Sequence, residues 1–319
     1  MTLRPLLALV GPTASGKTEA SLPVAEALGA EIVCVDSMLV YRGMEVGTAK
    51  PTAEQRNRVP HHLLDIAEPG EPFSAARFQG EARVATLDIE GRGRRPLLVG
   101  GGGLYYRAMV DGLNFPGTAP ETRSLLETEA LALGPEALLG RLAAFDPEAA
   151  ARIGRGNARR TVRALEVAAL TGRAFSEHYA DWAAYPEERV RAVGIDIPRT
   201  ALHRRIEHRV HWMMAELLEE TSTLLERGSG RFLTSSQAIG YAEAVACLEG
   251  KIDREEAAER TIRRTKALAR RQMAWLRRDP RIGWIPTDED GAAGIVDQVI
   301  AALGRAGREP VAGALRQEA

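Results

Sequence analysis

The stretch that decides the fold is Gly11-Pro12-Thr13-Ala14-Ser15-Gly16-Lys17-Thr18. It follows the apolar run at residues 6–10 and has the spacing of a phosphate-binding P-loop, G-x-x-x-x-G-K-[ST]. Its glycines let the backbone curl so that N–H groups point at phosphate oxygens, and a helix beginning near Gly16 adds its positive end. Lys17 supplies a mobile cation and Thr18 a hydroxyl for Mg²⁺. The motif predicts that a di- or triphosphate binds here, and it leaves open which one.

Alternating strand and helix patterns surround this loop. Short apolar runs at 6–10, 31–35 and 96–99 are typical of buried parallel strands, and 190–197 is a fourth. Between them, residues 17–28 and 74–90 read as helices, the second capped by Ser74. We therefore expect an α/β fold with a P-loop NTPase-like parallel sheet flanked by helices.

The remaining chain has helical composition. Residues 115–187 are rich in Ala, Leu, Glu and Arg, which predicts a helical insertion domain between two parts of the core, 1–114 and 188–303. The second core part forms a helical C-terminal region, with long helices expected at 199–226 and 254–278. Residues 304–319 carry Gly, Pro and charge and are expected to be a frayed tail.

Composition narrows the class of protein. The net charge is −1, and no apolar run approaches the ~20 residues that span a membrane. The two cysteines, Cys34 and Cys247, form no CxxC pair, which argues against a disulfide framework or a zinc site. The first ten residues do not resemble a signal peptide. We expect a cytoplasmic protein that acts without a membrane and as a monomer.

Basic residues concentrate near the C-terminal end. From Arg260 to Arg281 there are nine Lys or Arg and one acid, Asp279, which gives a local charge of +8. Arg263, Arg270 and Arg277 recur every seven residues, so they share one helix face. Because this segment itself holds almost no acids, we interpret the face as one that binds a nucleic-acid backbone. A second basic cluster contains residues 159, 160 and 163.

Two further features carry chemistry. Asp36 ends an apolar strand beside the P-loop, where a carboxylate can bind Mg²⁺ or accept a proton from a substrate; a turn or cap role is the alternative. The run 97–99 leads into four glycines, Gly100 to Gly103, where many P-loop ATPases carry an acid. The glycines allow close backbone approach or form a flexible turn, and the missing acid argues against ATP hydrolysis. For the pair His61-His62 we expect structural hydrogen bonds rather than a metal site.

Seven stretches together resemble the bacterial tRNA dimethylallyltransferases, also called tRNA isopentenyltransferases. They occur in family order over almost the whole chain: GPTASGKT (11–18), VDSMLVYRGMEVGTAKP (35–51), VPHHLLDI (59–66), LLVGGGGLYYRA (97–108), RRTVRALEV (159–167), SSQAIGYAEA (235–244) and ARRQMAWLR (269–277). The resemblance implies transfer of a dimethylallyl group from dimethylallyl diphosphate to N6 of the adenine 3′-adjacent to the anticodon of tRNA. It also implies that Mg²⁺, held at Thr18, assists departure of the diphosphate.

The same resemblance implies roles for individual residues. The catalytic set is Asp36 as the base, together with Lys17, Thr18, Arg205 and the position of Gly102. The donor diphosphate is expected on Gly11, Pro12, Thr13, Ala14, Ser15, Gly16, Lys17 and Thr18. Contact with the tRNA anticodon stem-loop is expected at Asp36, Ser37, Met38, Leu39, Arg123, Arg159, Arg160, Thr161, Val162, Arg163, Ser236, Gln237, Ala238, Ile239, Gly240, Tyr241, Arg263, Arg270 and Arg271.

One departure and three alternatives accompany this hypothesis. Gly102 stands where the family usually has threonine, so a hydroxyl thought important for catalysis is missing. An adenylate isopentenyltransferase acting on free nucleotide is the first alternative, although it would need neither the basic helix nor the insertion. A P-loop small-molecule kinase is the second, and a nucleic-acid-binding protein without catalysis is the third.

Overall fold

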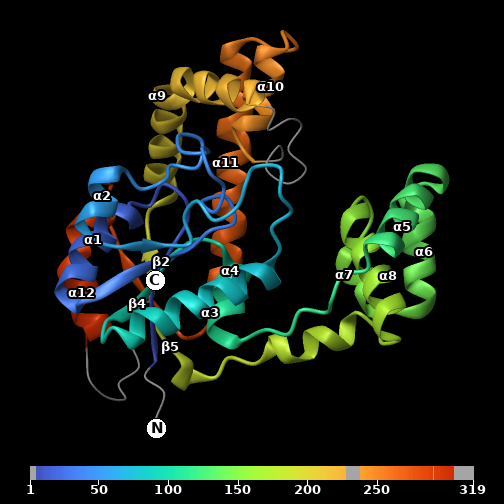
Figure 1. The fold of residues 1–319 in the computed structure, drawn as a ribbon, viewed down its shortest axis with the longest axis horizontal. Coiled ribbons are helices and arrows are strands. Elements are labelled where there is room, and N and C mark those ends of the chain that lie inside the picture. Colours follow the sequence, from blue (N-terminus) through green and yellow to red (C-terminus); the bar gives the residue numbers. More distant parts are fainter. Residues whose placement is uncertain (1–4, 228–237, 290, 305–319) are drawn as a thin grey trace, which may run out of the picture. The chain divides into compact units, whose positions relative to one another are not determined.

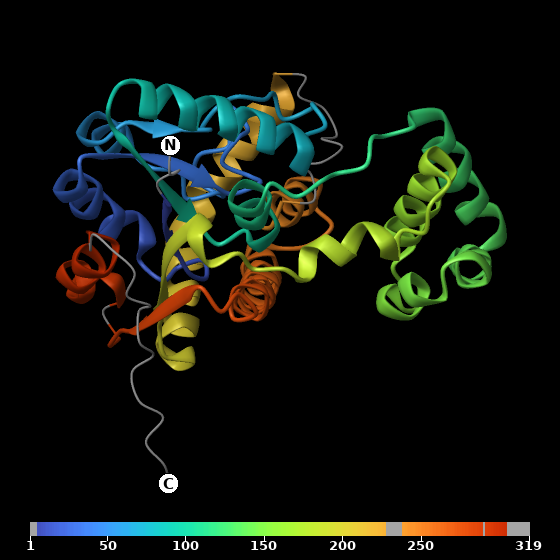
Figure 2. The ribbon, with the colours of Figure 1, turned by 90° about the horizontal axis from the view of Figure 1, so that it is seen from below.

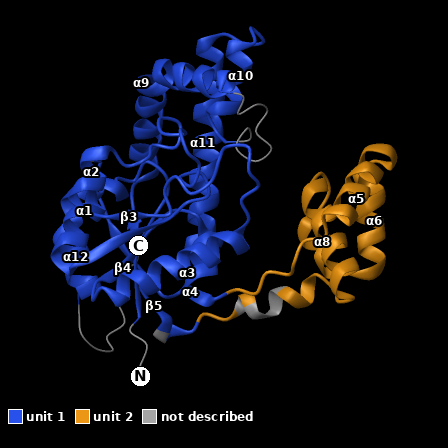
Figure 3. Ribbon diagram, viewed as in Figure 1, with its two compact units in different colours: residues 1–112, 186–319 blue, residues 113–185 orange. Residues whose placement is uncertain are grey.

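The computed structural model describes residues 5–227, 238–289 and 291–304. It consists of two compact units, one formed by residues 1–112 and 186–319 and the other by Leu113–Tyr185 (Figure 3). Each unit has its own buried core, so each is described by itself.

The larger unit is built on a six-stranded sheet in which every pairing is parallel. The strand order is β3-β2-β4-β1-β5-β6, which places β1 and the loop after it at the centre. The strands are β1 Leu6–Val10, β2 Ala30–Val35, β3 His61–His62, β4 Arg95–Gly100, β5 Val190–Asp196 and β6 Ile282–Pro286. The predicted α/β fold with a parallel sheet is confirmed.

The sequence reading missed two edge strands. β3 has only two residues, too few for a periodic pattern to appear. Its histidines make the hydrogen bonds we expected: His62 Nε2 lies 2.7 Å from Glu31 Oε2, and His61 Nδ1 lies 2.7 Å from the Val59 carbonyl. β6 follows directly on the basic helix, whose charge obscured a short strand.

Helices cover both faces of the sheet because both faces are apolar. Leu7, Leu9 and Val193 belong to a core shared with α1 and α12, whereas Ala8 and Val10 belong to a second core shared with α3, α4 and α9. Figure 2 shows α3 on the opposite side of the sheet from α1 and α12. The helices of this unit are α1 Lys17–Leu28, α2 Ala53–Arg58, α3 Ala75–Gly91, α4 Gly103–Asp111, α9 Arg199–Glu226, α10 Tyr241–Leu248, α11 Arg254–Leu276 and α12 Val296–Gly304, with 3-10 turns at η2 Glu187–Arg189 and η4 Gly291–Ile295.

The long helices α9 and α11 run side by side, with α10 packed on both (Figure 1). The predicted bounds of α9 are correct, and α11 ends two residues before the expected Arg278. Apolar residues of α9 such as Ile206 and Val210 are fully buried against the sheet-side core. This packing fixes the opposite face of α9 beside the loop that follows β1.

The smaller unit is a helical bundle. Proline opens each of its first three helices, and Asp146 and Asn157 cap α7 and α8 by accepting backbone N–H groups. Its core contains Leu126, Leu138 and Leu142. The elements are α5 Pro120–Leu133, α6 Pro135–Phe145, α7 Pro147–Ile153, α8 Ala158–Thr171 and η1 Ser176–Ala183.

Within the described residues, none of the helices combines the length and apolar character that crossing a bilayer requires.

Candidate active site

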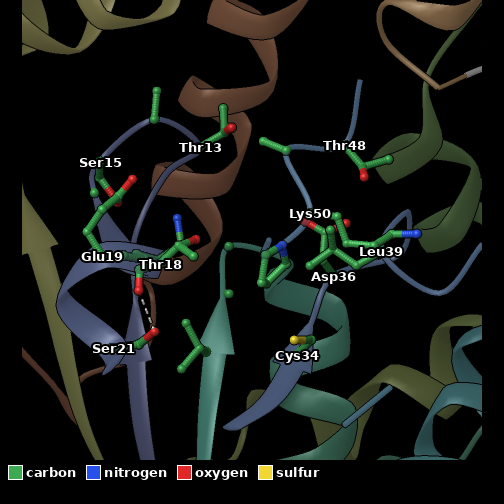
Figure 4. A pocket seen from close by; sticks show the side chains of 18 of the residues that line it. Thr13, Ser15, Thr18, Glu19, Ser21, Cys34, Asp36, Leu39, Thr48 and Lys50 are labelled. Carbon is green, nitrogen blue, oxygen red and sulfur yellow. Dashed lines mark hydrogen bonds between the residues drawn. The ribbon is translucent and has the colours of Figure 1, made fainter. Parts of the chain in front are cut away.

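A cavity of about 700 Å³ lies at the carboxyl ends of β1, β2 and β4. The loop after β1 forms one wall, the segment 48–52 another, and one face of α9 a third. Figure 4 shows Thr13, Ser15 and Thr18 on one side of the cavity and Asp36 and Thr48 on the other. Ligands of open α/β sheets bind at this edge because loops from neighbouring strands converge there.

The loop 11–18 has the shape that its sequence predicts. Gly16 has a φ of +86° and stands directly before α1, without a side chain that could cap the helix. The N–H groups of the first turn of α1 therefore face the cavity with the positive end of the helix dipole. Ser15 Oγ donates to the Pro12 carbonyl over 2.8 Å, and Lys17 Nζ donates to the same carbonyl over 2.6 Å. These internal hydrogen bonds hold the loop in a curled form.

Lys17 and Asp36 are both cavity residues with shifted pKa values. Burial lowers the pKa of Lys17 to about 8, against the opposing pull of Asp36. Burial also raises the pKa of Asp36, although the Met38 N–H, which donates to Asp36 Oδ1 over 2.8 Å, and the charge of Lys17 act in the other direction. A carboxylate with a raised pKa is a better proton acceptor. The cavity therefore contains both a cation that can meet an anionic group and a carboxylate that can accept a proton.

Helix α9 contributes two arginines that contact the loop 11–18 at the cavity. Arg205, the residue expected near the diphosphate, donates from Nε to the Ala14 carbonyl over 2.9 Å. Arg209, one turn later, donates to Thr13 Oγ1 over 2.9 Å, while its buried Nε has no hydrogen-bond partner among the described residues. Burial lowers the pKa of Arg209. Sequence reasoning missed Arg209, although its spacing of four from Arg205 on a helix would have placed both on one face.

The glycine run after β4 packs closely against neighbouring segments and is not merely a flexible turn. A Cβ on Gly101 would lie 2.5 Å from Gln272 Nε2 and 2.7 Å from the Gly11 carbonyl. Gln272, on α11, also accepts the Thr13 N–H over 2.8 Å. Gln272 is a second residue that sequence reasoning missed, and it joins the basic helix to the phosphate loop.

Gly102 differs from Gly101. It precedes α4 with a φ of −77°, which any residue can adopt, and a Cβ there would lie 3.2 Å from the Val35 carbonyl. The position is therefore close to the end of β2, next to Asp36, and leaves limited room for a side chain.

Some of the residues expected to bind tRNA are buried in the fold. Asp36, Ser37, Met38 and Leu39 are partly exposed, and Asp36 and Leu39 line the cavity, but Ala238, Gly240 and Tyr241 are buried. The Tyr241 hydroxyl donates to Glu220, whose other oxygen accepts the N–H groups of Glu45 and Val46. A side-chain contact from Ala238 or Tyr241 to RNA is thus not supported, because both pack inside the larger unit. Ile239 is partly exposed, and Ser236 and Gln237 lie outside the described residues.

In the basic cluster of the smaller unit, some residues are buried, some are ion-paired and some are exposed. Thr161 and Val162 are 1% and 4% exposed, so their side chains belong to the bundle core and not to a surface that could meet RNA. Arg123 and Arg163 pair with the buried Glu166, over 2.7 and 2.8 Å. Arg159 and Arg160 are exposed on the first turn of α8. The helix is amphipathic and buries one side, so only some of the residues 159–163 reach solvent.

The sequence reading of the basic helix needs a correction. Acids from other parts of the fold, and from the preceding turn of α11, pair with most of its cations. Within the described residues, Arg270, Arg271 and Arg278 make no ion pair, and they are exposed. The pairs are Arg260 with Glu256, Arg263 with Glu259, Arg264 with Glu243, Lys266 with Glu207, Arg277 with Asp196, and Arg281 with Asp111 and Asp279. The free positive face is therefore smaller than the local charge of the sequence indicates.

The described residues contain no group of three or more His, Cys, Asp or Glu side chains that could hold a metal ion. Thr18 lines the cavity beside Lys17. Mg²⁺ typically takes only one or two protein ligands and completes its shell with substrate phosphate oxygens and water. A single hydroxyl at the cavity is compatible with that type of binding.

Comparison with known proteins agrees with this geometry. The family model described as IPP transferase matches residues 39–279, and the one described as Isopentenyl transferase matches residues 4–65. The tRNA dimethylallyltransferase of Nocardioides sp. is 48% identical over 93% of this chain and 96% of its own length. That of Anaeromyxobacter dehalogenans is 49% identical over 92% of this chain and 99% of its own.

A solved structure supports the same grouping. The tRNA isopentenylpyrophosphate transferase of Bacillus halodurans is 38% identical, with a TM-score of 0.67 over 95% of this chain and 97% of its own. The cavity beside a phosphate loop, the family match over most of the chain and the similarity to these enzymes lead to one conclusion: this chain belongs to the IPP transferase family, a family of prenyltransferases.

Proposed function

We propose that this protein transfers the dimethylallyl group of dimethylallyl diphosphate to N6 of the adenine 3′-adjacent to the anticodon of tRNA. The C1–O bond of the donor breaks, diphosphate leaves, the C1–N6 bond forms, and N6 loses a proton. The observation that carries the proposal is the placement of Lys17, Arg209 and Asp36 around one cavity. Its phosphate end suits the leaving group, and its carboxylate suits the amine.

The phosphate end matches a diphosphate chemically. The first-turn N–H groups of α1, Lys17, Arg205 and Arg209 provide positive charge where negative charge develops on the departing oxygen. Arg209 adds a specific argument, because a buried guanidinium N–H without a partner is costly until an acceptor arrives. When bound, Mg²⁺ at Thr18 would supply further positive charge to the leaving group.

Asp36 is proposed as the base. Its carboxylate ends β2 across the cavity from the loop, so it can accept a hydrogen bond from the adenine amine and then take its proton. Because a target base must leave its stack to enter such a cavity, the acceptor is expected to be an unpaired loop nucleotide. The next three residues, Ser37, Met38 and Leu39, are partly exposed and are proposed to contact the RNA strand.

The wider RNA surface is proposed to include exposed arginines of both units: Arg159 and Arg160 on α8, and Arg270 and Arg271 on α11. Arg263 pairs with Glu259 over 3.4 Å, a distance and exposure at which a phosphate can compete. Since these are backbone contacts, we expect RNA affinity to fall steeply as salt rises. A cytoplasmic location is proposed because the proposed acceptor is tRNA, and the monomeric state stays a prediction.

Measuring which acceptor receives the labelled group distinguishes the proposed function from the three alternatives. Purified protein with Mg²⁺ and radiolabelled dimethylallyl diphosphate is offered an anticodon stem-loop with the target adenine, the same RNA with guanine there, and AMP. We expect label in the first RNA alone. Label in AMP would favour an adenylate isopentenyltransferase. RNA binding without label would favour a binding protein, and ATP turnover without RNA would favour a kinase.

Arg209→Met tests the phosphate end. We expect the donor KM to rise at least about tenfold with RNA affinity unchanged, since one charged hydrogen bond to the diphosphate is lost. Arg260→Met is the matched control, because Arg260 is an exposed arginine paired within α11 and outside the cavity. Equal donor KM values for the two variants would contradict the role of Arg209.

A further inference from the structure

Trp212, on α9, is the exposed aromatic side chain of the described part of the larger unit. It leaves 69% of its surface in contact with solvent. An exposed leucine is ordinary, but an indole has a large apolar area whose exposure costs free energy that burial would recover. No packing role within the fold accounts for it. Trp212 also lines the wall of the active-site cavity. The exposed ring therefore presents a flat apolar surface at the active-site cavity.

Two arginines and a histidine lie beside Trp212 on α9. Arg205, His208 and Arg209 lie three to seven residues before it, on the helix face that lines the same cavity. Arg205 and Arg209 reach the phosphate loop, whereas Trp212 comes later along the helix and is open to water. The face thus changes from partly buried arginines to an exposed aromatic ring. This combination of positive charge and an aromatic platform is typical of proteins that bind unpaired nucleotides.

Two parts of the substrates could use the ring. The five-carbon chain of the donor needs a dry apolar wall, and the cavity has one at its base, where Ile32, Cys34 and Val99 are 1%, 3% and 8% exposed. A ring that remains mostly in water does not offer that environment. A nucleobase, by contrast, has a face similar in size to indole and covers an exposed ring from outside. The exposure of Trp212 therefore favours the base.

We propose that Trp212 stacks on an unpaired base of the RNA acceptor next to the target adenine and so holds the strand at the mouth of the cavity. This rests on the proposed function. Trp212 is a positioning residue: it touches a flanking nucleotide and leaves the chemistry to the groups at the base of the cavity.

Steady-state kinetics with Trp212→Ala and Trp212→Phe provide the test. Base stacking on an aromatic ring corresponds to roughly a tenfold or greater change in RNA affinity. We expect Trp212→Ala to raise the KM for the stem-loop about tenfold and to leave the donor KM within about twofold. Trp212→Phe is expected to restore most of the RNA affinity, because it keeps a ring. Leu87→Ala, a change at a similarly exposed apolar residue on α3 outside the cavity, is the control and should alter neither constant.

A second substrate set identifies the partner base. Stem-loops with an abasic nucleotide immediately 5′ or 3′ of the target adenine are measured with wild type and Trp212→Ala. If the ring stacks on one of these bases, its removal weakens wild-type binding and has little further effect on the variant. Additive effects at both positions would overturn the inference, as would a raised donor KM with unchanged RNA affinity, which would place the ring on the prenyl chain. Absence of label in RNA with the wild type would refute the proposed function instead, and RNA anisotropy would still test the stacking.

Discussion

Replacing Glu166 by alanine is expected to destabilise the helical unit Leu113–Tyr185 by about 2–4 kcal/mol. The Glu166 side chain is 0% exposed and pairs with Arg123 over 2.7 Å and with Arg163 over 2.8 Å. It also accepts the Ala119 N–H over 2.8 Å and so ties the start of α5 to α8. The change removes all three interactions and leaves a space behind.

The magnitude follows from the exposure of the partners. Breaking a fully buried ion pair costs about 3–5 kcal/mol because the remaining charge stays unpaired. Arg123 and Arg163 are 40% and 27% exposed, so water can solvate them after the loss and the cost falls. The lost backbone hydrogen bond and the space left by the carboxylate add to this cost. The expected total loss of stability is about 2–4 kcal/mol.

Hydrogen exchange of the full chain, followed by mass spectrometry, measures this change. The opening free energy of backbone amides in α5 and α8 should fall by the stated amount, while amides of the sheet in the larger unit stay unchanged. Glu129→Ala is the matched control: its pair with Arg141 is 45% and 59% exposed, so less than about 1 kcal/mol is expected. Equal protection of α8 in both variants would refute the reasoning.

The same carboxylate predicts a pH dependence. Burial alone would raise the pKa of Glu166, but hydrogen bonds from Arg163, Arg123 and the Ala119 N–H outweigh it, and the pKa lies below the ordinary value of 4.5. A carboxylate with a lowered folded pKa stabilises the unit above the unfolded value and loses that contribution as pH falls through the folded one. Protection of α8 is therefore expected to weaken below about pH 4.5 in the wild type, and the Glu166→Ala variant should show less of this loss.

Three further predictions concern the cavity. Asp36→Asn is expected to lower the single-turnover transfer rate by about 10²–10⁴-fold with RNA affinity unchanged, because it removes the proton acceptor; an unaltered rate would exclude Asp36 as the base. Because the pKa of Lys17 is about 8 in the free protein, its charge disappears as pH rises through that value, and kcat/KM for the donor should fall on the alkaline side with that midpoint. A profile that stays level to about pH 10, near the ordinary pKa of lysine, would contradict this. Gly101→Ala places a methyl 2.5 Å from Gln272 Nε2 and should weaken donor binding at least about tenfold, whereas Gly102→Ala, 3.2 Å from the Val35 carbonyl, should cost much less; donor KM values for the two variants decide it.

Local patterns allowed much of the larger unit to be predicted. The strand runs, the P-loop and the bounds of α1 and α9 follow from apolar periodicity and turn residues, which act within a few residues of each other. The family match confirms the family that the seven motifs indicated, because motifs of that length in one order are specific. Edge strand β3 was missed because two residues leave no periodic signal, and β6 because it follows closely on the strongly charged basic helix.

The sequence by itself determined the fold class, the phosphate loop and the identity of the base candidate, since each depends on neighbours along the chain. Only the tertiary structure decided which charges are free: acids far away in sequence, such as Asp196 and Glu207, pair with the basic helix. It also placed Arg209, Trp212 and Gln272 at the cavity and buried Tyr241 and Thr161. Ion pairing and burial depend on distances through space, and those distances exist only once the helices pack.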